Sequence, residues 1–354
     1  MSPRQLLFAL ALLLLTSLTA HAGERVSLST VTPPAPLSAA EPLARAFSLR
    51  KAASYLDQAA LNWQKKRKCG TCHTNFAYMV ATAGLREFHT PAPDIRTFFE
   101  HMVSTYWEEK GPRWPAEVVC AATTLALHDR VTTGKLHPLT RKAFERMFSL
   151  QRDDGSWQWL VCGWPPFESD DHYGVTFAAL GLAMAPERFA ETPPAKKALG
   201  KIRDYLKKNP PKSPQHSAML VWLSTYMDGI FTAEERKSVV EALLALQQPD
   251  GGWNIVTLLP EDHKRQDDEP QDVETSDGYA TGFVIYVARQ AGIDQNAPRL
   301  KRGIAWLKAN QRESGRWFTR SPTKNSRHFI SNAGTAFAVL ALTSCGETGR
   351  QRRF

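Results

Sequence analysis

Two cysteines and a histidine stand close together in the first quarter of the chain, as Cys69-Gly-Thr-Cys72-His73. This spacing is the attachment motif of c-type haem, in which two thioethers hold the porphyrin vinyl groups and the adjacent imidazole binds the iron. We therefore predict a covalent haem c as cofactor, attached at Cys69 and Cys72, with His73 as the metal ligand. Two alternatives stay open: a redox disulfide between Cys69 and Cys72, and a short zinc site beside which His73 merely lies.

An acidic cluster, Glu168-Ser-Asp170-Asp171-His172, precedes an apolar segment in the middle of the chain. Crowded carboxylates in a medium of low dielectric constant raise the pKa of one another, so that one of them keeps a proton to donate. The cluster resembles the acid motif of class II terpene cyclases, and this resemblance implies Asp170, Asp171 and Glu168 as candidate catalytic acids.

The same cluster has a purely structural interpretation, in which Ser169 or Asp170 caps the N-terminus of the following helix. Asp171 would then lie in the first turn, where the helix dipole favours negative charge. Asp277 and Asn332 occupy the corresponding place before two later apolar segments. That recurrence favours capping.

The elements that must position these residues are marked by a repeat, Gln-x-x-x-Gly-x-Trp. It occurs at Gln151/Gly155/Trp157, Gln247/Gly251/Trp253 and Gln311/Gly315/Trp317. Each copy ends a segment of helical periodicity, and its glycine supplies the backbone freedom that is needed just past a helix end. A more apolar helix follows each copy, so each repeat is a helical hairpin.

The same succession of a long helix, a loop and an apolar helix recurs more weakly in three other places. This raises the number of predicted hairpins to six. A hairpin with one amphipathic and one apolar helix cannot bury its own apolar faces, so six of them close into a double-walled ring. We predict an all-α fold, an (α/α)6 toroid over residues 46–345. The weaker copies are 52–84, 95–128 and 196–228, and the apolar helices after the motifs are 175–184, 281–291 and 333–342.

The segment from Arg302 to Trp317 resembles the QW motif of the terpene cyclase family, with Leu307, Gln311 and Gly315 at the family's spacing. Residues 140–345 are similar to squalene-hopene cyclase and prenyltransferase toroids in their motifs. Residues 50–345 are similar to them in the alternation of outer and inner helices. The resemblance implies that the Gln and Trp side chains tie neighbouring helix ends together. Neither Asp170 nor Asp277 has the following cysteine of the prenyltransferase zinc site, which disfavours zinc-dependent prenyl transfer.

The acidic cluster also resembles the Asp-x-Asp-Asp motif of class II terpene cyclases, with Asp170 at the position of the central acid. In that family the acid protonates an alkene. The chain departs from the family pattern at Glu168, where the family has Asp, and at His172, where it has Thr. Both departures weaken the transfer of this activity.

The N-terminus indicates export, because Arg4, an apolar run over 6–15 and Ala20-His-Ala22 form a signal peptide with a cleavage site. We expect a signal peptide over 1–22, a Pro/Ser-rich linker over 23–45 and a basic tail over 346–354, in a periplasmic or secreted protein. The formal net charge is +9. Short basic runs allow peripheral contact with a membrane, whereas an exported protein is not expected to meet nucleic acid.

We expect a haem protein for electron transfer or oxidoreduction beside an apolar cavity, with an exported redox partner and an isoprenoid or other apolar molecule as possible ligand. One alternative is a protonation-initiated isoprenoid cyclase, and another is a toroid that binds lipid or protein without catalysis. Aromatic residues near the predicted mouth either line such a cavity or belong to the core. They are Trp114, Trp164, Phe167, Tyr173 and Tyr279.

Two further expectations concern the surroundings of the haem. His172, His216 and His328 each stand near the start of a predicted inner helix and are candidates for a distal haem ligand. Cys120 and Cys162 are placed at neighbouring inner-helix starts, which allows a disulfide between them.

Overall fold

The computed structural model describes residues 26–70, 72–82, 85, 89–326 and 328–347, with Cys72 described by its backbone alone. The predicted signal peptide and all but the first two residues of the predicted tail lie outside these ranges. Within them the chain forms helices and no β-strand, apart from two isolated bridges, Leu43 with Arg312 and Trp164 with Glu168.

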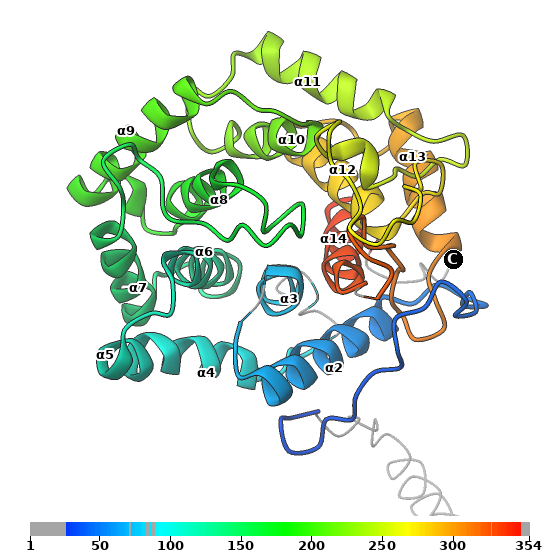
Figure 1. Cartoon of the computed structure of the whole chain (residues 1–354), viewed down its shortest axis with the longest axis horizontal. Coiled ribbons are helices and arrows are strands. Elements are labelled where there is room, and N and C mark those ends of the chain that lie inside the picture. The colour runs from blue at the N-terminus through cyan, green and yellow to red at the C-terminus, as the bar shows by residue number, and fades with distance from the viewer. Residues whose placement is uncertain (1–25, 71, 83–84, 86–88, 327, 348–354) are drawn as a thin grey trace, which may run out of the picture.

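The helices form two concentric rings, and the chain passes alternately from the outer ring to the inner one (Figure 1). This is an (α/α)6 toroid of six hairpins, as the sequence predicts. The outer ring consists of α2 (Leu49–Arg67), α4 (Pro93–His101) with η3 (Met102–Tyr106) and α5 (Trp107–Lys110), α7 (Pro138–Ser149), α9 (Pro193–Lys208), α11 (Ala233–Ala245) and α13 (Pro298–Ala309). The inner ring consists of η1 (Cys72–Phe76) with α3 (Ala77–Thr82), α6 (Pro115–Thr132), α8 (Asp171–Met184), α10 (Pro214–Leu223), α12 (Gly278–Gln290) and α14 (Ile330–Ser344). Two short turns of 3-10 helix, Phe189–Glu191 and Val256–Leu258, lie in the connections.

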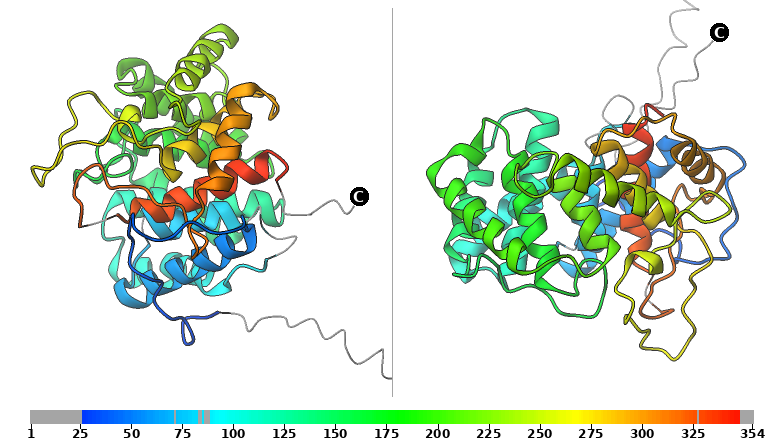
Figure 2. Two further views of the ribbon diagram at one scale, coloured as in Figure 1. Left: turned by 90° about the vertical axis from the view of Figure 1, so that its right-hand side faces the viewer. Right: turned by 90° about the horizontal axis from the view of Figure 1, so that it is seen from above.

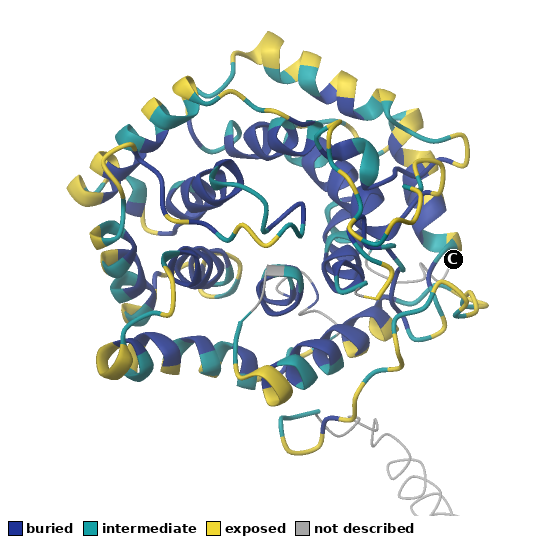
Figure 3. Ribbon diagram, in the orientation of Figure 1, coloured by how far each residue is buried: buried dark blue, intermediate teal, exposed yellow. Residues whose placement is uncertain are grey.

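Burial separates the two rings, as Figure 3 shows. The inner helices α8, α12 and α14 are apolar and buried on nearly every side. The outer helices bury one stripe and expose the other, as α9 does with Ala195, Ala198, Leu199 and Ile202. Apolar residues all round a helix require neighbours all round it, so the sequence of each helix selects its ring. None of the described helices has the length and apolar character to cross a membrane.

Local signals fix where the helices begin. Pro occupies the first turn of α4, α6, α7, α9, α10 and α13, where its missing N–H costs no hydrogen bond. Side-chain caps start α2, through Ser48, and α11, where Thr232 forms a capping box with Glu235, and Ser213 also caps α10.

The glutamine of each Gln-x-x-x-Gly-x-Trp copy joins one outer helix to the next. Gln151 Nε2, after α7, donates to the carbonyl of Ala198 in α9 at 3.2 Å. Gln247 Nε2 donates to Arg299 of α13 at 2.7 Å, and Gln311 Nε2 donates to Ser48 at the start of α2 at 2.9 Å. The third tie joins the last outer helix to the first and therefore closes the ring.

The glycine and tryptophan of each copy complete the joint. Gly315 has φ +96°, and a Cβ there would lie 2.4 Å from the backbone of Lys51, so only glycine allows the two helices to approach this closely. Each indole Nε1 donates to a carbonyl ten residues earlier, as Trp317 does to Leu307 at 2.7 Å. Trp157 and Trp253 do the same with Met147 and Leu243. The structural role expected of these residues is confirmed.

An N-terminal arm, residues 26–48, lies across the joint between α13 and α2. The guanidinium of Arg316, a residue only 1% exposed, donates to the carbonyls of Ala35 and Pro36 at 2.8 and 2.6 Å and pairs with Glu41. Backbone bonds between Ala44 and Gln311 add to the contact. The predicted linker is thus an arm bound to the seam of the ring.

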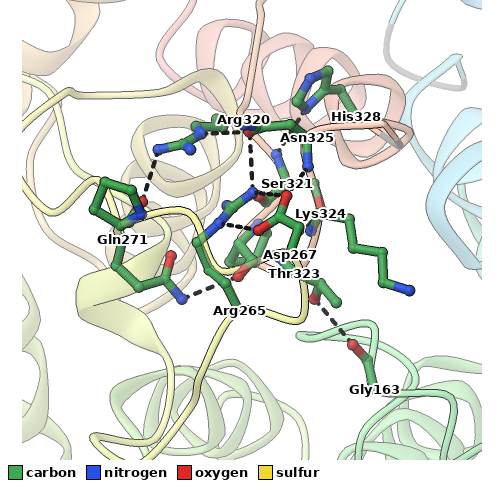
Figure 4. A network of polar contacts seen from close by, with 12 residues as sticks. Gly163, Arg265, Asp267, Gln271, Arg320, Ser321, Thr323, Lys324, Asn325 and His328 are labelled. Atoms are coloured by element: carbon green, nitrogen blue, oxygen red, sulfur yellow. Dashed lines mark hydrogen bonds and ion pairs between the residues drawn. The ribbon is translucent and has the colours of Figure 1, made fainter.

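Three loops meet at one end of the barrel: 159–169, 259–277 and 318–329. Figure 2 shows the last two projecting together from the body. Arg265 joins them by donating to the carbonyl of Ser321 at 2.6 Å, and Asp267, which pairs with Arg265 in the same loop, accepts from Asn325 N at 2.6 Å (Figure 4). Thr323 Oγ1 donates to the carbonyl of Gly163 at 3.0 Å and attaches the first loop. The acidic loop 259–277 is therefore anchored to its neighbours.

Candidate functional site

The segment that contains Cys69 and His73 opens onto a cavity of about 570 Å³ at the end of the barrel where these loops meet. The walls come from η1, from the starts of the inner helices α6 and α14, from the end of α2 and from the loops before α8 and α14. They combine aromatic and aliphatic side chains with a few polar ones. The lining residues are Trp63, Arg67, Cys69, Gly70, His73, Phe76, Trp114, Ala116, Glu117, Cys120, Leu160, Cys162, Trp164, Pro165, Phe167, Glu168, Ser321, Pro322, Phe329 and Ile330.

His73 is held in one orientation by its neighbours. Its ring stacks on Phe329 with 5.4 Å between centroids and meets the edge of Trp63 at 4.9 Å. Its Nδ1 lies 2.9 Å from Oγ1 of Thr74. Burial lowers the pKa of His73 to about 4, because the interior disfavours the imidazolium ion. At neutral pH the ring is therefore uncharged, which is the form that binds a metal ion.

A series of buried hydrogen bonds continues from Thr74 behind His73. Asn332 Nδ2 donates to Thr74 Oγ1 at 3.0 Å, and Tyr55 Oη donates to Asn332 Oδ1 at 2.6 Å. The guanidinium of Arg316 lies over the ring of Tyr55 at 5.6 Å. Because Arg316 binds the N-terminal arm, this series of contacts connects the seam of the ring to the imidazole. Groups that orient the second nitrogen of a metal-binding histidine commonly tune the site.

The loop before η1 has little freedom of sequence. A Cβ on Gly70 would lie 2.6 Å from the ring of Phe99, which stacks with Phe76 at 5.1 Å. The backbone at Gly70 thus rests on an aromatic pair, and Cys69 lies beside the cavity. The side chain of Cys72 lies outside the described residues.

One wall of the cavity offers groups suited to a carboxylate. The guanidinium of Arg67 lies over the ring of Trp63 at 5.7 Å, and both residues line the cavity. The indole Nε1 of Trp63 is buried and has no hydrogen-bond partner. A buried N–H without an acceptor costs free energy, so a bound acceptor would stabilise this wall. Haem carries two propionates, an apolar macrocycle and an iron atom, and the residues present fit each of these parts.

The loop 159–169 forms the opposite wall and carries Glu168 and Cys162. Antiparallel backbone bonds between Trp164 and Glu168 stiffen it, and Cys162 N donates to the carbonyl of Glu168 at 3.0 Å. Burial raises the pKa of Glu168, and a hydrogen bond with Cys162 partly opposes this effect. Glu168 is therefore the one residue of the acidic cluster that faces the same cavity as His73.

The rest of the acidic cluster lies elsewhere. Asp170 is the N-cap of α8, and its Oδ1 accepts from Tyr173 N at 3.1 Å. Its Oδ2 lies 3.0 Å from Nε2 of His216. Burial alone would raise the pKa of Asp170, but the hydrogen bond and charge of His216 outweigh it, and the pKa is lowered. Proton donation to an alkene needs a carboxyl group whose pKa is raised. The contacts of Asp170 agree instead with its interpretation as a helix cap.

Asp171 and Asp277 are also held in structural contacts. Asp171 lies 3.5 Å from Arg152 and accepts from Trp159 N. Asp277 caps α12, and burial raises its pKa to about 7. Asp277 borders another cavity, of about 340 Å³, whose lining includes neither His73 nor Asp170. Glu168, Asp170 and Asp277 thus line three separate cavities.

The axis of the barrel is filled with aromatic side chains. Phe167, at the tip of the loop before α8, packs against Tyr173 at 5.4 Å and Tyr279 at 5.7 Å. The cavity that remains below them measures about 30 Å³, the share of liquid volume of roughly one water molecule. Of the five aromatic residues expected near the mouth, Trp114, Trp164 and Phe167 border the larger cavity, whereas Tyr173 and Tyr279 belong to the core.

Two expectations, about distal histidine ligands and about a disulfide, disagree with the structure. His172 and His216 line a different cleft, and His328 accepts from Ser321 N at 3.1 Å without bordering the cavity of His73. No disulfide joins the described cysteines, so the predicted pairing of Cys120 with Cys162 is wrong. These two residues belong to different walls of one cavity, since Cys120 is buried on α6 and Cys162 is exposed on the loop.

Several residues of the site went unnoticed in the sequence. Thr74 directly follows the motif, and its position next to His73 is the sequence signal for a partner of the second ring nitrogen. Trp63 lies ten residues before His73 in an ordinary amphipathic helix. Asn332 and Tyr55 stand 277 positions apart, and nothing in the sequence connects them.

Known structures show the same fold at low sequence identity. A polysaccharide lyase, BACCELL_00875, aligns with a TM-score of 0.50 and 13% identity over 86% of this chain and 98% of its own. A glycosyl hydrolase of family 88 from Bacteroides vulgatus gives 0.51 and 10% over 83% and 98%. A possible member of the GH105 family from Klebsiella pneumoniae subsp. pneumoniae gives 0.50 and 12% over 85% and 94%. At this identity the similarity shows the fold alone. No protein-family model and no curated protein matches the chain.

Proposed function

We propose that this chain is an exported c-type haem protein on an (α/α)6 toroid, and that it serves electron transfer or oxidoreduction beside an apolar cavity. Cys69 and Cys72 would hold the haem by thioethers, and His73 would bind its iron. The terpene cyclase resemblance of the repeat then describes a shared scaffold, whereas the chemistry depends on the cofactor.

One observation carries this proposal. The histidine of the motif is half-buried, uncharged at neutral pH and oriented by Thr74, and it borders a cavity of about 570 Å³ with mostly apolar walls. Cavities of roughly 300–1,000 Å³ with such walls are the usual size for cofactors. A CxxCH sequence that arose by chance would need no cavity beside it.

The bound haem would supply reversible one-electron chemistry, and the protein residues would set its surroundings. Arg67 and Trp63 would hold a propionate through a cation and an N–H donor. Thr74 and Asn332 would fix the orientation of the imidazole. Glu168, whose pKa is raised, would retain a proton more readily than an exposed carboxylate and could exchange it with a molecule in the cavity.

The alternative of an isoprenoid cyclase has less support. An axial cavity of about 30 Å³ cannot hold an isoprenoid chain unless Phe167 and its loop move away. The lowered pKa of Asp170 disfavours the proton donor that such a reaction requires. Export and a periplasmic or secreted location rest on the N-terminal sequence and belong to the same proposal, as does an exported redox partner.

The full chain produced together with a cytochrome c maturation system tests the proposal. We expect Soret and α absorption bands and an intact mass that exceeds the mature polypeptide by one haem. Cys69→Ala and Cys72→Ala together should abolish the covalent haem, whereas the matched control Cys345→Ala, at the end of α14, should retain it. A mature chain without added mass or visible bands would refute the haem assignment.

A further inference from the structure

A second cleft, of about 560 Å³, lies outside the wall of α8, away from the cavity of His73. It is formed by the N-terminus of α8, the connection between α9 and α10, and the segment 259–262, which belong to neighbouring hairpins (Figure 1). The lining residues are Asp170, Asp171, His172, Tyr205, Asn209, Pro210, Lys212, Pro214, His216, Leu259, Pro260, Glu261 and Asp262.

Two histidines form the floor of this cleft. The rings of His172 and His216 stack with 4.3 Å between centroids. His216 Nδ1 accepts from the backbone N–H of Lys212 at 3.3 Å, so its proton is on Nε2, which donates to Asp170 at 3.0 Å. Both nitrogens of His216 are therefore engaged, and Asp170 is kept ionised.

His172 is as buried as its neighbour, at 6% against 5% exposed, but neither of its ring nitrogens has a hydrogen-bond partner. Burial, followed by the charge of His216, lowers its pKa to about 4, so at neutral pH it presents one N–H donor and one lone pair. Burying both without partners destabilises the fold unless a ligand or ordered water pairs with them. The unpaired nitrogens point to a ligand in the cleft.

The charge of the cleft indicates which kind of ligand it would take. Four carboxylates line it, at Asp170, Asp171, Glu261 and Asp262, against the single ammonium of Lys212. The whole chain, in contrast, has a formal net charge of +9, so its surface as a whole repels cations. A local acidic cleft on a basic protein favours a cationic ligand at that one place.

The remaining walls suit a carbon chain. Tyr205, Pro210, Pro214 and Leu259 also border the cleft, together with the exposed acids Glu261 and Asp262. An ammonium group at each end of a short aliphatic chain could reach both polar regions. A lone pair on His172 and the oxygens of the carboxylates are acceptors for N–H donors.

We propose that this cleft binds a small aliphatic molecule with protonated amino groups. One ammonium donates toward His172 and the carboxylate of Asp170, and the carbon chain lies against Tyr205 and Leu259. Glu261 and Asp262 hold the second ammonium at the open edge. The site is separate from the proposed haem cavity and does not depend on it.

Isothermal titration of the mature full chain with 1,4-diaminobutane, at neutral pH and low ionic strength, tests this proposal. We expect one site per chain, weakened by salt, and no binding of 1,4-butanediol, which has the same length without charge. The substitution His172→Phe keeps the ring stack but removes both nitrogens, and should weaken binding by about tenfold or more.

Matched variants separate the cleft from general attraction. Glu261→Gln and Asp262→Asn should each weaken binding by about threefold, as expected for exposed ion pairs. Glu145→Gln on α7 and Asp228→Asn after α10 remove the same charges elsewhere on the surface and should leave binding unchanged. Equal loss in both pairs, equal binding of the diol, or no heat with the diamine would each overturn the proposal.

Discussion

At the scale of single residues, each of the two cavities is bordered by an imidazole whose pKa is lowered. The pKa values of His73 and His172 are both lowered to about 4, in each case chiefly by burial. His73 has a hydroxyl partner in Thr74, whereas the nitrogens of His172 have no hydrogen-bond partner. The first ring is oriented by a partner beside the larger cavity, and the second has unsatisfied nitrogens beside the second cleft.

The lowered pKa of His172 predicts a defined dependence of stability on pH. Folding favours the neutral ring, so its contribution is complete above the unfolded value of 6.5 and is lost as the pH falls toward about 4. Between about pH 7 and pH 5 the wild-type protein should lose about 2 kcal/mol more unfolding free energy than His172→Phe. Urea unfolding of both proteins at the two pH values measures the difference, and identical losses would contradict the assigned burial.

The same substitution has a second expected effect at neutral pH. A phenyl ring has no unsatisfied nitrogens, so His172→Phe should raise the free energy of unfolding of the ligand-free protein by about 1 kcal/mol. A variant that is more stable yet binds the diamine less tightly would show that the imidazole is retained for binding. A less stable variant would show that the ring is needed for packing.

The hydrogen bonds behind His73 should be energetically coupled. Tyr55→Phe removes one donor, and Asn332→Ala leaves both the tyrosine hydroxyl and Thr74 without their buried partner, at a cost of about 1–3 kcal/mol. In a double-mutant cycle the two changes should cost about 1 kcal/mol less together than the sum of the separate effects. Strict additivity in urea unfolding would show that the chain does not act as a unit.

At the scale of elements, the joints between outer helices explain why the repeat has its particular residues. The glutamine binds the backbone of the next outer helix, the glycine allows the approach, and the tryptophan returns a hydrogen bond to its own helix. Three of the outer helices, α7, α11 and α13, are joined in this way to their successors. The joint of α13 with α2 has the additional task of closing the ring.

A pair of glycine substitutions tests the closing joint. Gly315→Ala places a Cβ 2.4 Å from the backbone of Lys51 at a φ of +96°, whereas Gly292→Ala has a φ of +88° and open space around the Cβ. The control should cost only the backbone strain, about 1 kcal/mol, and Gly315→Ala should cost about 2 kcal/mol or more beyond it. Equal loss in chemical unfolding would mean that the close approach is not required.

At the scale of the whole molecule, the N-terminal arm acts as a strap on the seam of the ring. It supplies the carboxylate of Glu41 and two carbonyls to Arg316, whose side chain is 1% exposed. A buried cation without its partners is strongly destabilising. The ring and the arm therefore depend on each other, and the polar chain from Arg316 to His73 extends this dependence to the site.

Removal of the arm should weaken the entire ring. A chain that begins at Ser48 should lose about 3–5 kcal/mol of unfolding free energy, because Arg316 loses the carboxylate of Glu41 and two carbonyl acceptors together. In an Arg316→Met background the same truncation should cost less. Calorimetry and urea unfolding of the four proteins measure this, and an equal cost in both backgrounds would rule out the role of Arg316.

The sequence by itself determined the architecture, because the signals for it are local and periodic. The repeat marks the ends of helices, and apolar residues all round a segment place it in the inner ring. The motif of Cys69 and His73 and the cap at Asp170 are likewise contained within a few consecutive residues. Such features can be predicted because short stretches of chain carry them.

Only the tertiary structure decided which residues share a cavity. Glu168 and Asp170 are two positions apart, yet the turn into α8 sends one to the cavity of His73 and the other to the cleft of His172. Asn332 and Tyr55 come from opposite ends of the chain and meet because the ring closes there. Grouping of this kind depends on ring closure and on side-chain direction at helix starts, and neither is encoded in the local spacing of residues.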